Sequence, residues 1–131
     1  MRYSAVLVDH FLHPRNAGLM RAPDGVGADE YDGCGDLARF YLRVREGLVT
    51  ETRFQTYGCG PTIAAASAAS ELVIGRAVAD LAGLKAREVE EALDGLPDDR
   101  KHAADVVAGA LRAAALDALG RDARGGTAGG A

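Results

Sequence analysis

Two short turns of the form Gly-Cys-Gly most constrain how this chain can fold. They lie at Gly33-Cys34-Gly35 and Gly58-Cys59-Gly60 and contain the only two cysteines among the 131 residues. Glycine permits tight turns that other residues avoid, so each cysteine is expected on an accessible loop. Core cysteines rarely have glycine on both sides. The pattern is therefore more typical of a metal or sulfur site, with incidental cysteines as the alternative.

A β-hairpin is predicted between these two turns. Residues 39–45 alternate between apolar and polar side chains, as in a strand that is buried on one face. A turn follows at residues 46–47, and residues 48–57 are rich in Thr, Val, Phe and Tyr, which favours a second antiparallel strand. In an antiparallel pair the start of one strand lies beside the end of the other. We therefore expect Cys34 and Cys59 to face each other.

Helices are predicted before and after the hairpin. Pro14 ends an apolar run, and Pro61 suits the first position of a helix, where its missing N–H would be unpaired in any case. The helix after Pro61 consists mainly of Ala and Ser, which predicts close packing against a neighbouring element. The predicted helices cover residues 4–13, 61–74, 78–81 and 86–93, followed by a long final helix that Asp98 or Asp99 caps.

The remaining segments set the expected domain organisation. Residues 15–33 contain so many turn-forming residues that an irregular loop is expected, with one short strand at residues 28–31. Residues 1–120 are long enough for a single domain with one hydrophobic core, and residues 121–131 are expected to form a disordered glycine-rich tail. The final helix carries an apolar stripe of helical period: Ala103, Val106, Val107, Ala110, Leu111, Ala114 and Ala118.

Composition argues against several classes of function. The formal charge is −4 and the 15 Lys and Arg residues are scattered, which argues against nucleic-acid binding. No segment approaches the roughly 20 apolar residues of a membrane span, and the first residues do not resemble a signal peptide. We therefore expect a cytoplasmic protein with no membrane or nucleic-acid partner. In a reducing cytosol, two cysteines are more typical of ligands or reactive thiols than of a disulfide.

Further candidate ligands lie close to the cysteines. Cys59 precedes the N-terminus of a predicted helix, where unpaired N–H groups favour negative charge. Asp36 lies two residues after the first cysteine, so both side chains point the same way in an extended segment. His102 lies in the first turn of the final helix, and by itself it is more typical of an ordinary core or surface histidine. The other histidines, His10 and His13, are expected at a helix end and on its exposed face.

Four stretches make the sequence similar to a known family. They are Asp9-His10 with Pro14-Arg15-Asn16 and Gly18, Cys34-Gly35-Asp36, residues 53–60, and Leu96-Pro97 with His102. The run Thr-Tyr-Gly-Cys-Gly within residues 53–60 is the most specific part. On these motifs the chain resembles the IscU/NifU-type scaffold proteins of iron–sulfur cluster assembly over residues 3–120. The resemblance implies an α+β fold, in which a small antiparallel sheet of about three strands packs against several helices.

The resemblance also implies a site and its occupants. Cys34, Asp36, Cys59 and His102 would line an exposed assembly site that binds iron and a transient [2Fe-2S] cluster, with Zn²⁺ as an alternative occupant. A cysteine desulfurase would supply sulfur as persulfide on Cys34 or Cys59, and apo-proteins would accept the cluster. Iron in a cluster prefers sulfur to the hard oxygen of a carboxylate, so Asp36 should exchange easily and the cluster should be short-lived. Such a protein is a scaffold and not an enzyme.

Two positions depart from the family pattern. Ala103 stands where the family normally has a third cysteine, although two sulfur, one oxygen and one nitrogen donor still suffice for Zn²⁺ or a [2Fe-2S] cluster. Asp98-Asp99 replaces the Pro-Val of a Leu-Pro-Pro-Val-Lys stretch, so a dedicated Hsp70 partner is not expected. Two alternatives stay open: a zinc-bound, sulfurtransferase-like partner of the desulfurase, and a degenerate regulatory paralogue.

Overall fold

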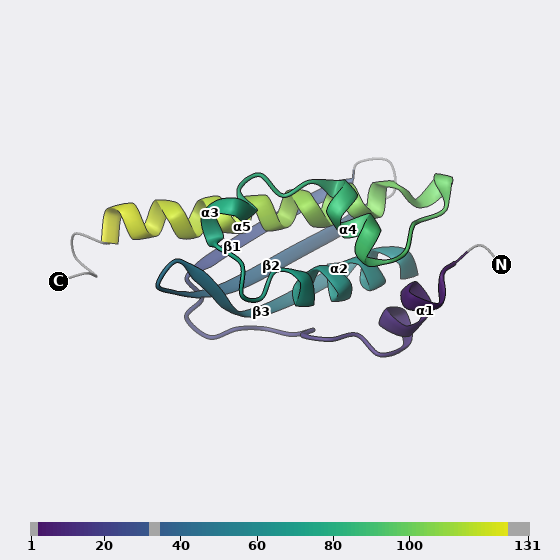
Figure 1. Ribbon diagram of the computed structural model, residues 1–131, viewed down its shortest axis with the longest axis horizontal. Helices are drawn as coiled ribbons and strands as arrows, with labels where there is room; N and C mark the ends of the chain where they lie inside the picture. The colour runs from purple at the N-terminus through teal and green to yellow at the C-terminus, as the bar shows by residue number, and fades with distance from the viewer. Residues whose placement is uncertain (1–2, 32–34, 126–131) are drawn as a thin grey trace.

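One antiparallel sheet forms the centre of the fold (Figure 1). The computed structural model describes residues 3–31 and 35–125. Within these segments the sheet has three strands in the order β1-β2-β3, and both neighbouring pairs are antiparallel. The strands are β1 (Gly25–Tyr31), β2 (Asp36–Arg45) and β3 (Leu48–Tyr57). The α+β class with three strands is therefore confirmed.

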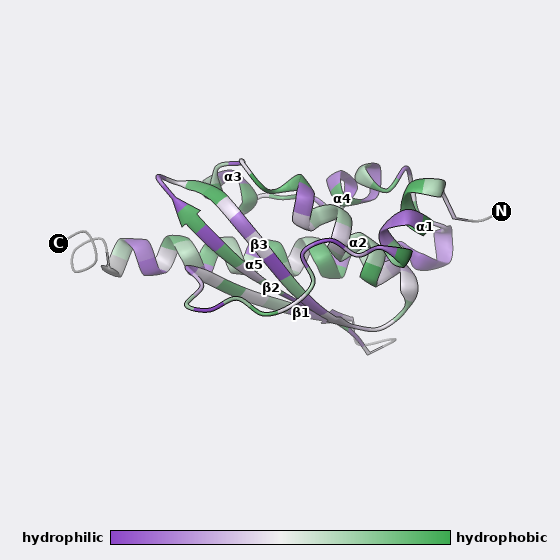
Figure 2. Ribbon diagram, turned by 90° about the horizontal axis from the view of Figure 1, so that it is seen from below, coloured by the Kyte–Doolittle hydropathy of each residue, from purple (hydrophilic) through white to green (hydrophobic). Residues whose placement is uncertain are grey.

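The hairpin of β2 and β3 follows from the alternation of apolar and polar residues. Phe40 pairs with Phe54 and Leu42 pairs with Thr52, and all four side chains are buried on the inner face of the sheet. Hydrophilic and hydrophobic residues alternate along both strands in Figure 2. A shift in register between Arg43 and Val44 precedes the turn. The predicted hairpin is confirmed, and β2 begins three residues earlier than expected, at Asp36.

The helices pack on the sheet and on one another. Their bounds are α1 (Ala5–Leu12), α2 (Gly60–Leu72), α3 (Val78–Leu81), α4 (Ala86–Ala92) and α5 (His102–Gly125). The helices before α5 match the predicted ranges to within two residues at each end. α5 lies along β1 and β2, α2 packs on β3 and on α5, and α1 packs on α2. α1 and the C-terminal part of α5 lie at opposite ends of the molecule (Figure 1).

The start of α5 differs from the prediction. Asp98–Arg100 form a 3-10 turn, in which the Arg100 N–H donates to the carbonyl of Pro97 at 2.9 Å. The α-helix begins only at His102, so the prediction that Asp98 or Asp99 caps it was wrong. The tighter 3-10 turn occupies the residues that were assigned to the first turn of the helix.

The other end of α5 extends further than expected. The helix runs to Gly125, so residues 121–125 continue it instead of starting the predicted disordered tail. Arg121 forms an ion pair with Asp117 one turn earlier, which supports the added turn. Residues 126–131 lie outside the described residues. Among the described helices, α5 included, none combines the length and hydrophobicity that a membrane span needs.

β1 is longer than the short strand predicted at residues 28–31. It begins at Gly25. Gly25 and Gly27 lie against α5, where there is no space for a side chain. A Cβ atom at Gly27 would lie 2.1 Å from the backbone nitrogen of Ala114. These glycines are therefore required by a close approach of strand and helix. In the sequence they were attributed to a loop.

The hydrophobic core lies between the sheet and the helices. Most residues of α2 are buried, which its many small side chains allow. Most of the buried apolar residues form one cluster that includes side chains of both strands and helices. The apolar stripe predicted in the final helix is confirmed, since Ala103, Val106, Val107, Ala110, Leu111, Ala114 and Ala118 are all buried.

Candidate metal centre

Asp36, Cys59 and His102 come together at one end of the molecule. Asp36 begins β2, Cys59 precedes α2 and His102 begins α5, so the fold gathers three element ends at one place. One oxygen, one sulfur and one nitrogen of these residues lie within 4.8 Å of one another. This end also carries α1 (Figure 1). Cys34, the fourth predicted ligand, lies outside the described residues, and its place in the site stays a prediction.

Asp36 is the centre of this cluster. Its side chain is only 4% exposed, and Oδ2 accepts hydrogen bonds from Thr62 Oγ1 at 2.7 Å, His102 Nε2 at 2.9 Å and Cys59 Sγ at 3.4 Å. Burial raises the pKa of the Asp36 carboxyl, but the three hydrogen bonds together outweigh burial and hold that pKa below its ordinary value. Asp36 is therefore an anion whose oxygen points at the other two donors.

The start of α2 places Cys59. Cys59 is the N-cap residue, with φ of −77° and ψ of 165°, and Pro61 occupies the start of the helix as predicted. The thiol makes no capping hydrogen bond to the helix. Its Sγ lies 3.3 Å from Thr62 Oγ1 and 3.4 Å from Asp36 Oδ2. The sulfur therefore belongs to the cluster and not to the helix cap.

Two residues that were not predicted from the sequence complete the surroundings. Tyr31 stacks on His102, with ring centroids 4.6 Å apart and planes inclined by 22°. Tyr31 is also the β1 partner of Asp36. The predicted strand at residues 28–31 contained Tyr31, but the pairing of that strand with β2 was not predicted. Thr62 is fully buried three residues after Cys59. Residues three apart lie on the same side of a helical turn. This spacing from Cys59 was the feature of the sequence that could have predicted Thr62 beside the site.

The donor set suits a first-row divalent ion. Zn²⁺ takes four ligands from sulfur, nitrogen and carboxylate oxygen, and three of these are present here. Ala103 contributes no donor, and its side chain is fully buried in the core. A tetrahedral metal site would therefore need a fourth ligand from elsewhere. Cys34, two residues before Asp36, is the candidate that the sequence offers.

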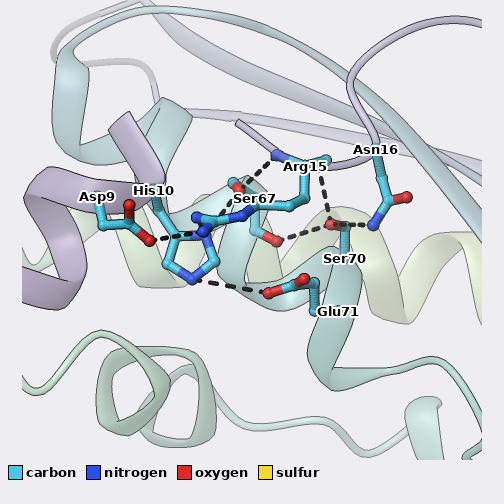
Figure 3. A network of polar contacts seen from close by, with 7 residues as sticks. All are labelled: Asp9, His10, Arg15, Asn16, Ser67, Ser70 and Glu71. Carbon is cyan, nitrogen blue, oxygen red and sulfur yellow. Dashed lines mark hydrogen bonds and ion pairs between the residues drawn. The ribbon is translucent and has the colours of Figure 1, made fainter. Parts of the chain in front are cut away.

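His10 does not lie on an exposed face, as the sequence suggested. It is 8% exposed, and its Nδ1 lies 2.7 Å from Ser67 Oγ and 3.1 Å from Arg15 Nη1 (Figure 3). Nδ1 therefore acts as an acceptor. The prediction was wrong because α1 packs this face against α2, whereas His13 is exposed as expected.

The network around His10 ties the segment after α1 to α2 (Figure 3). The Arg15 backbone N–H donates to Ser67 Oγ at 2.9 Å, and Asn16 Nδ2 donates to Ser70 Oγ at 3.0 Å. Burial and the neighbouring Arg15 guanidinium lower the pKa of His10. The network therefore holds His10 neutral and serves the packing of α1 and its following segment.

Comparison with known proteins places the chain in a family. Residues 2–124 match the family described as NifU-like N terminal domain. The chain belongs to this family. It is 38% identical over 115 residues to the Iron-sulfur cluster assembly scaffold protein IscU 1 of Archaeoglobus fulgidus, covering 88% of this chain and 75% of that protein. The resemblance found in the sequence is confirmed.

A second relative agrees with this family, and a solved structure shares the fold. The Iron-sulfur cluster assembly scaffold protein IscU of Azotobacter vinelandii is 36% identical over 121 residues, which cover 89% of this chain and 94% of that protein. The crystal structure of FiSufU from Fervidobacterium islandicum AW-1 superposes with a TM-score of 0.72 at 16% identity, covering 88% of this chain and 97% of that one. At this identity the likeness supports the NifU-like fold alone.

Proposed function

We propose that this NifU-like chain is an iron–sulfur cluster assembly scaffold and not an enzyme. The observation that carries the proposal is the convergence of Asp36, Cys59 and His102 at one end of the fold. The relatives named as scaffold proteins supply the class of function. The single scaffold domain expected at residues 1–120 is in keeping with the main cluster of buried apolar residues, and its last helix continues to Gly125.

Sulfur arrives from a cysteine desulfurase as persulfide. The thiolate of Cys59 or Cys34 attacks the outer sulfur of the donor persulfide, so that a new S–S bond forms and the desulfurase thiolate leaves. The outer sulfur thus passes to the scaffold cysteine, and the desulfurase cysteine returns to its thiolate form. Each transferred sulfur then needs two electrons from an external electron donor before it becomes sulfide. Cys59 suits the attack because the residue is partly exposed and its thiol makes no hydrogen bond that caps α2.

The cargo is a transient [2Fe-2S] cluster. Cys34, Asp36, Cys59 and His102 would supply two donors to each iron. Asp36 makes the cargo labile in two ways. Its hard oxygen is a weak ligand for iron in a cluster, and its Oδ2 regains hydrogen bonds from Cys59 and His102 when the cargo leaves, as in the arrangement described here.

Partners follow from this cycle. We propose a cysteine desulfurase as the donor and apo iron–sulfur proteins as acceptors, without a dedicated Hsp70 and without nucleic-acid or membrane partners. The thiols must be reduced before sulfur arrives, so we place the function in the cytoplasm.

A zinc-bound form is the second candidate function. One carboxylate, one thiol and one imidazole, with Cys34 as the fourth ligand, suit tetrahedral Zn²⁺. Such a protein would relay sulfur from the desulfurase and build no cluster. A degenerate regulatory paralogue would bind the desulfurase without metal or sulfur, even after Cys34→Ser and Cys59→Ser are combined.

Persulfide trapping and cluster transfer test the proposal together. The chain is incubated with desulfurase and cysteine, and alkylated persulfide on Cys34 and Cys59 is read by mass spectrometry. A chain loaded with iron and sulfide is then mixed with an apo [2Fe-2S] ferredoxin. The proposal expects persulfide and transfer of the cluster within minutes. Persulfide without any cluster, together with tightly bound Zn²⁺ and faster desulfurase turnover, would favour the sulfur relay.

A further inference from the structure

Thr62 contacts two members of the cluster formed by Asp36, Cys59 and His102. Its side chain is fully buried, and its hydroxyl donates to Asp36 Oδ2 at 2.7 Å. The same hydroxyl oxygen lies 3.3 Å from Cys59 Sγ. A threonine hydroxyl has one proton, and here that proton goes to the carboxylate.

Thr62 differs in one respect from the other two groups that donate to Asp36. Cys59 and His102 are themselves candidate ligands, and each must direct a lone pair and not a proton at a bound metal. Their hydrogen bonds to Oδ2 are therefore lost when a metal enters. Among the described residues that donate to Oδ2, Thr62 is therefore the one that would keep its bond in a loaded site.

We propose that Thr62 is a positioning residue of this site, whose hydroxyl holds the Asp36 carboxylate in the orientation that receives iron or zinc. The inference rests on the proposed function, because it requires Asp36 to be a ligand. Ligating carboxylates are commonly held by an outer hydrogen bond, and its loss weakens metal binding by about 10- to 100-fold.

The geometry shows which motion Thr62 prevents. Asp36 Oδ1 faces Gly58, and Oδ2 faces Cys59 and His102. Rotation about the bond to the carboxylate carbon would exchange or tilt the two oxygens. The bond from Thr62 fixes Oδ2 on the side of the other donors. Since Thr62 lies in the first turn of α2, that orientation is set by a packed helix.

Cobalt binding to the purified full chain tests this role. Co(II) is titrated anaerobically, and its visible d–d and thiolate charge-transfer bands report both affinity and ligand geometry. Thr62→Val removes the hydroxyl at nearly constant volume, and Thr62→Ala serves as a second variant that cannot overfill the site. We expect both to bind Co(II) about 10-fold or more weakly with altered d–d bands, and Thr62→Ser to restore both properties.

Thr52→Val is the matched control. Thr52 is another fully buried threonine, on β3, and its hydroxyl has no hydrogen-bond partner among the described residues. The same chemical change there should leave the cobalt affinity and spectrum unchanged. A folded Thr62→Val or Thr62→Ala chain with wild-type affinity and spectrum overturns the inference, and so does a Thr62→Ser chain as weak as Thr62→Val. Failure of the wild-type chain to bind Co(II) overturns the metal site itself and the proposed function with it.

Discussion

Gly58 and Asp36 lie so close together that residue 58 has no room for a side chain. A Cβ atom at Gly58 would lie 2.4 Å from Asp36 Oδ1, and the backbone there has φ of +147°. Both conditions favour glycine, because a side chain would collide with Asp36 and because residues other than glycine rarely adopt this φ. The glycine before Cys59 thus makes the space that the buried carboxylate occupies.

Replacing Gly58 by alanine should therefore damage the site more than the fold. We expect Gly58→Ala to displace Asp36 and to weaken Co(II) binding by about 10-fold or more. The strained φ alone should lower the free energy of unfolding by about 1–3 kcal/mol. Cobalt titration and urea denaturation measure the two effects. Gly75→Ala is the control, because Gly75 has φ of +89° and open space around it. Equal cobalt affinity in both variants would contradict this relationship.

Removing the Asp36 carboxylate should lengthen the life of a bound cluster. Asp36→Ala removes the proposed hard oxygen ligand, and it also removes the acceptor of the hydrogen bonds from Cys59 and His102. The decay of visible absorption after anaerobic loading measures this lifetime. The exposed Asp105 on α5 provides the control, since Asp105→Ala should decay like the wild type. An unchanged or shortened lifetime in Asp36→Ala would count against Asp36 as the labile ligand.

His10 should make the fold sensitive to mild acid. Burial and Arg15 hold the pKa of His10 below its ordinary value of 6.5. Between that lowered pKa and 6.5, the unfolded chain binds more protons than the folded chain. The free energy of unfolding should therefore fall as the pH falls below about 6.5. Urea denaturation at a series of pH values between 7.5 and 5 measures the slope.

A pair of histidine variants isolates this contribution. His10→Gln keeps a polar side chain beside Ser67 but cannot titrate, so its stability should vary less with pH over the same interval. His13 is exposed at the end of α1, and His13→Gln should keep the wild-type slope. The assignment fails if both variants show the same pH dependence as the wild type.

The contact between β1 and α5 should tolerate no side chain at Gly27. A Cβ atom there would meet the backbone of Ala110 and Ala114 at 2.1–2.5 Å, and neither helix backbone nor strand can yield cheaply. We expect Gly27→Ala to lower the free energy of unfolding by about 3 kcal/mol, near the upper part of the range for overpacked cores. Gly83→Ala, whose nearest neighbour would lie 3.8 Å away, should change it little. A loss below about 1 kcal/mol at Gly27 would contradict the close approach.

Periodicity predicted the elements that have two faces. The β2–β3 hairpin and the apolar stripe of α5 each bury one face, so their patterns appear in the sequence. The first half of β1 was missed because glycine is typical both of a turn and of a strand that lies against a helix, so Gly25 and Gly27 do not distinguish the two. Only the packing of α5 distinguishes the two, and that contact joins segments about 90 residues apart.

The site was predictable where its residues lie in local motifs. Cys59 was placed correctly because Pro61 indicates the start of a helix. Thr62 was overlooked because it sits in a run of small core residues, and its role depends on a carboxylate from another strand. His10 was misplaced because an amphipathic pattern does not reveal which side of a short helix another helix will cover.

Anaerobic reconstitution tests the central claim most directly. The chain is incubated with ferrous iron, cysteine and a cysteine desulfurase, and visible absorption is recorded together with iron and sulfide content per chain. The scaffold account predicts a nearly stoichiometric, labile [2Fe-2S] cluster in the wild type and none in Cys59→Ala, despite Ala103 in place of a third cysteine. A wild-type chain that forms no cluster and retains Zn²⁺ would contradict it.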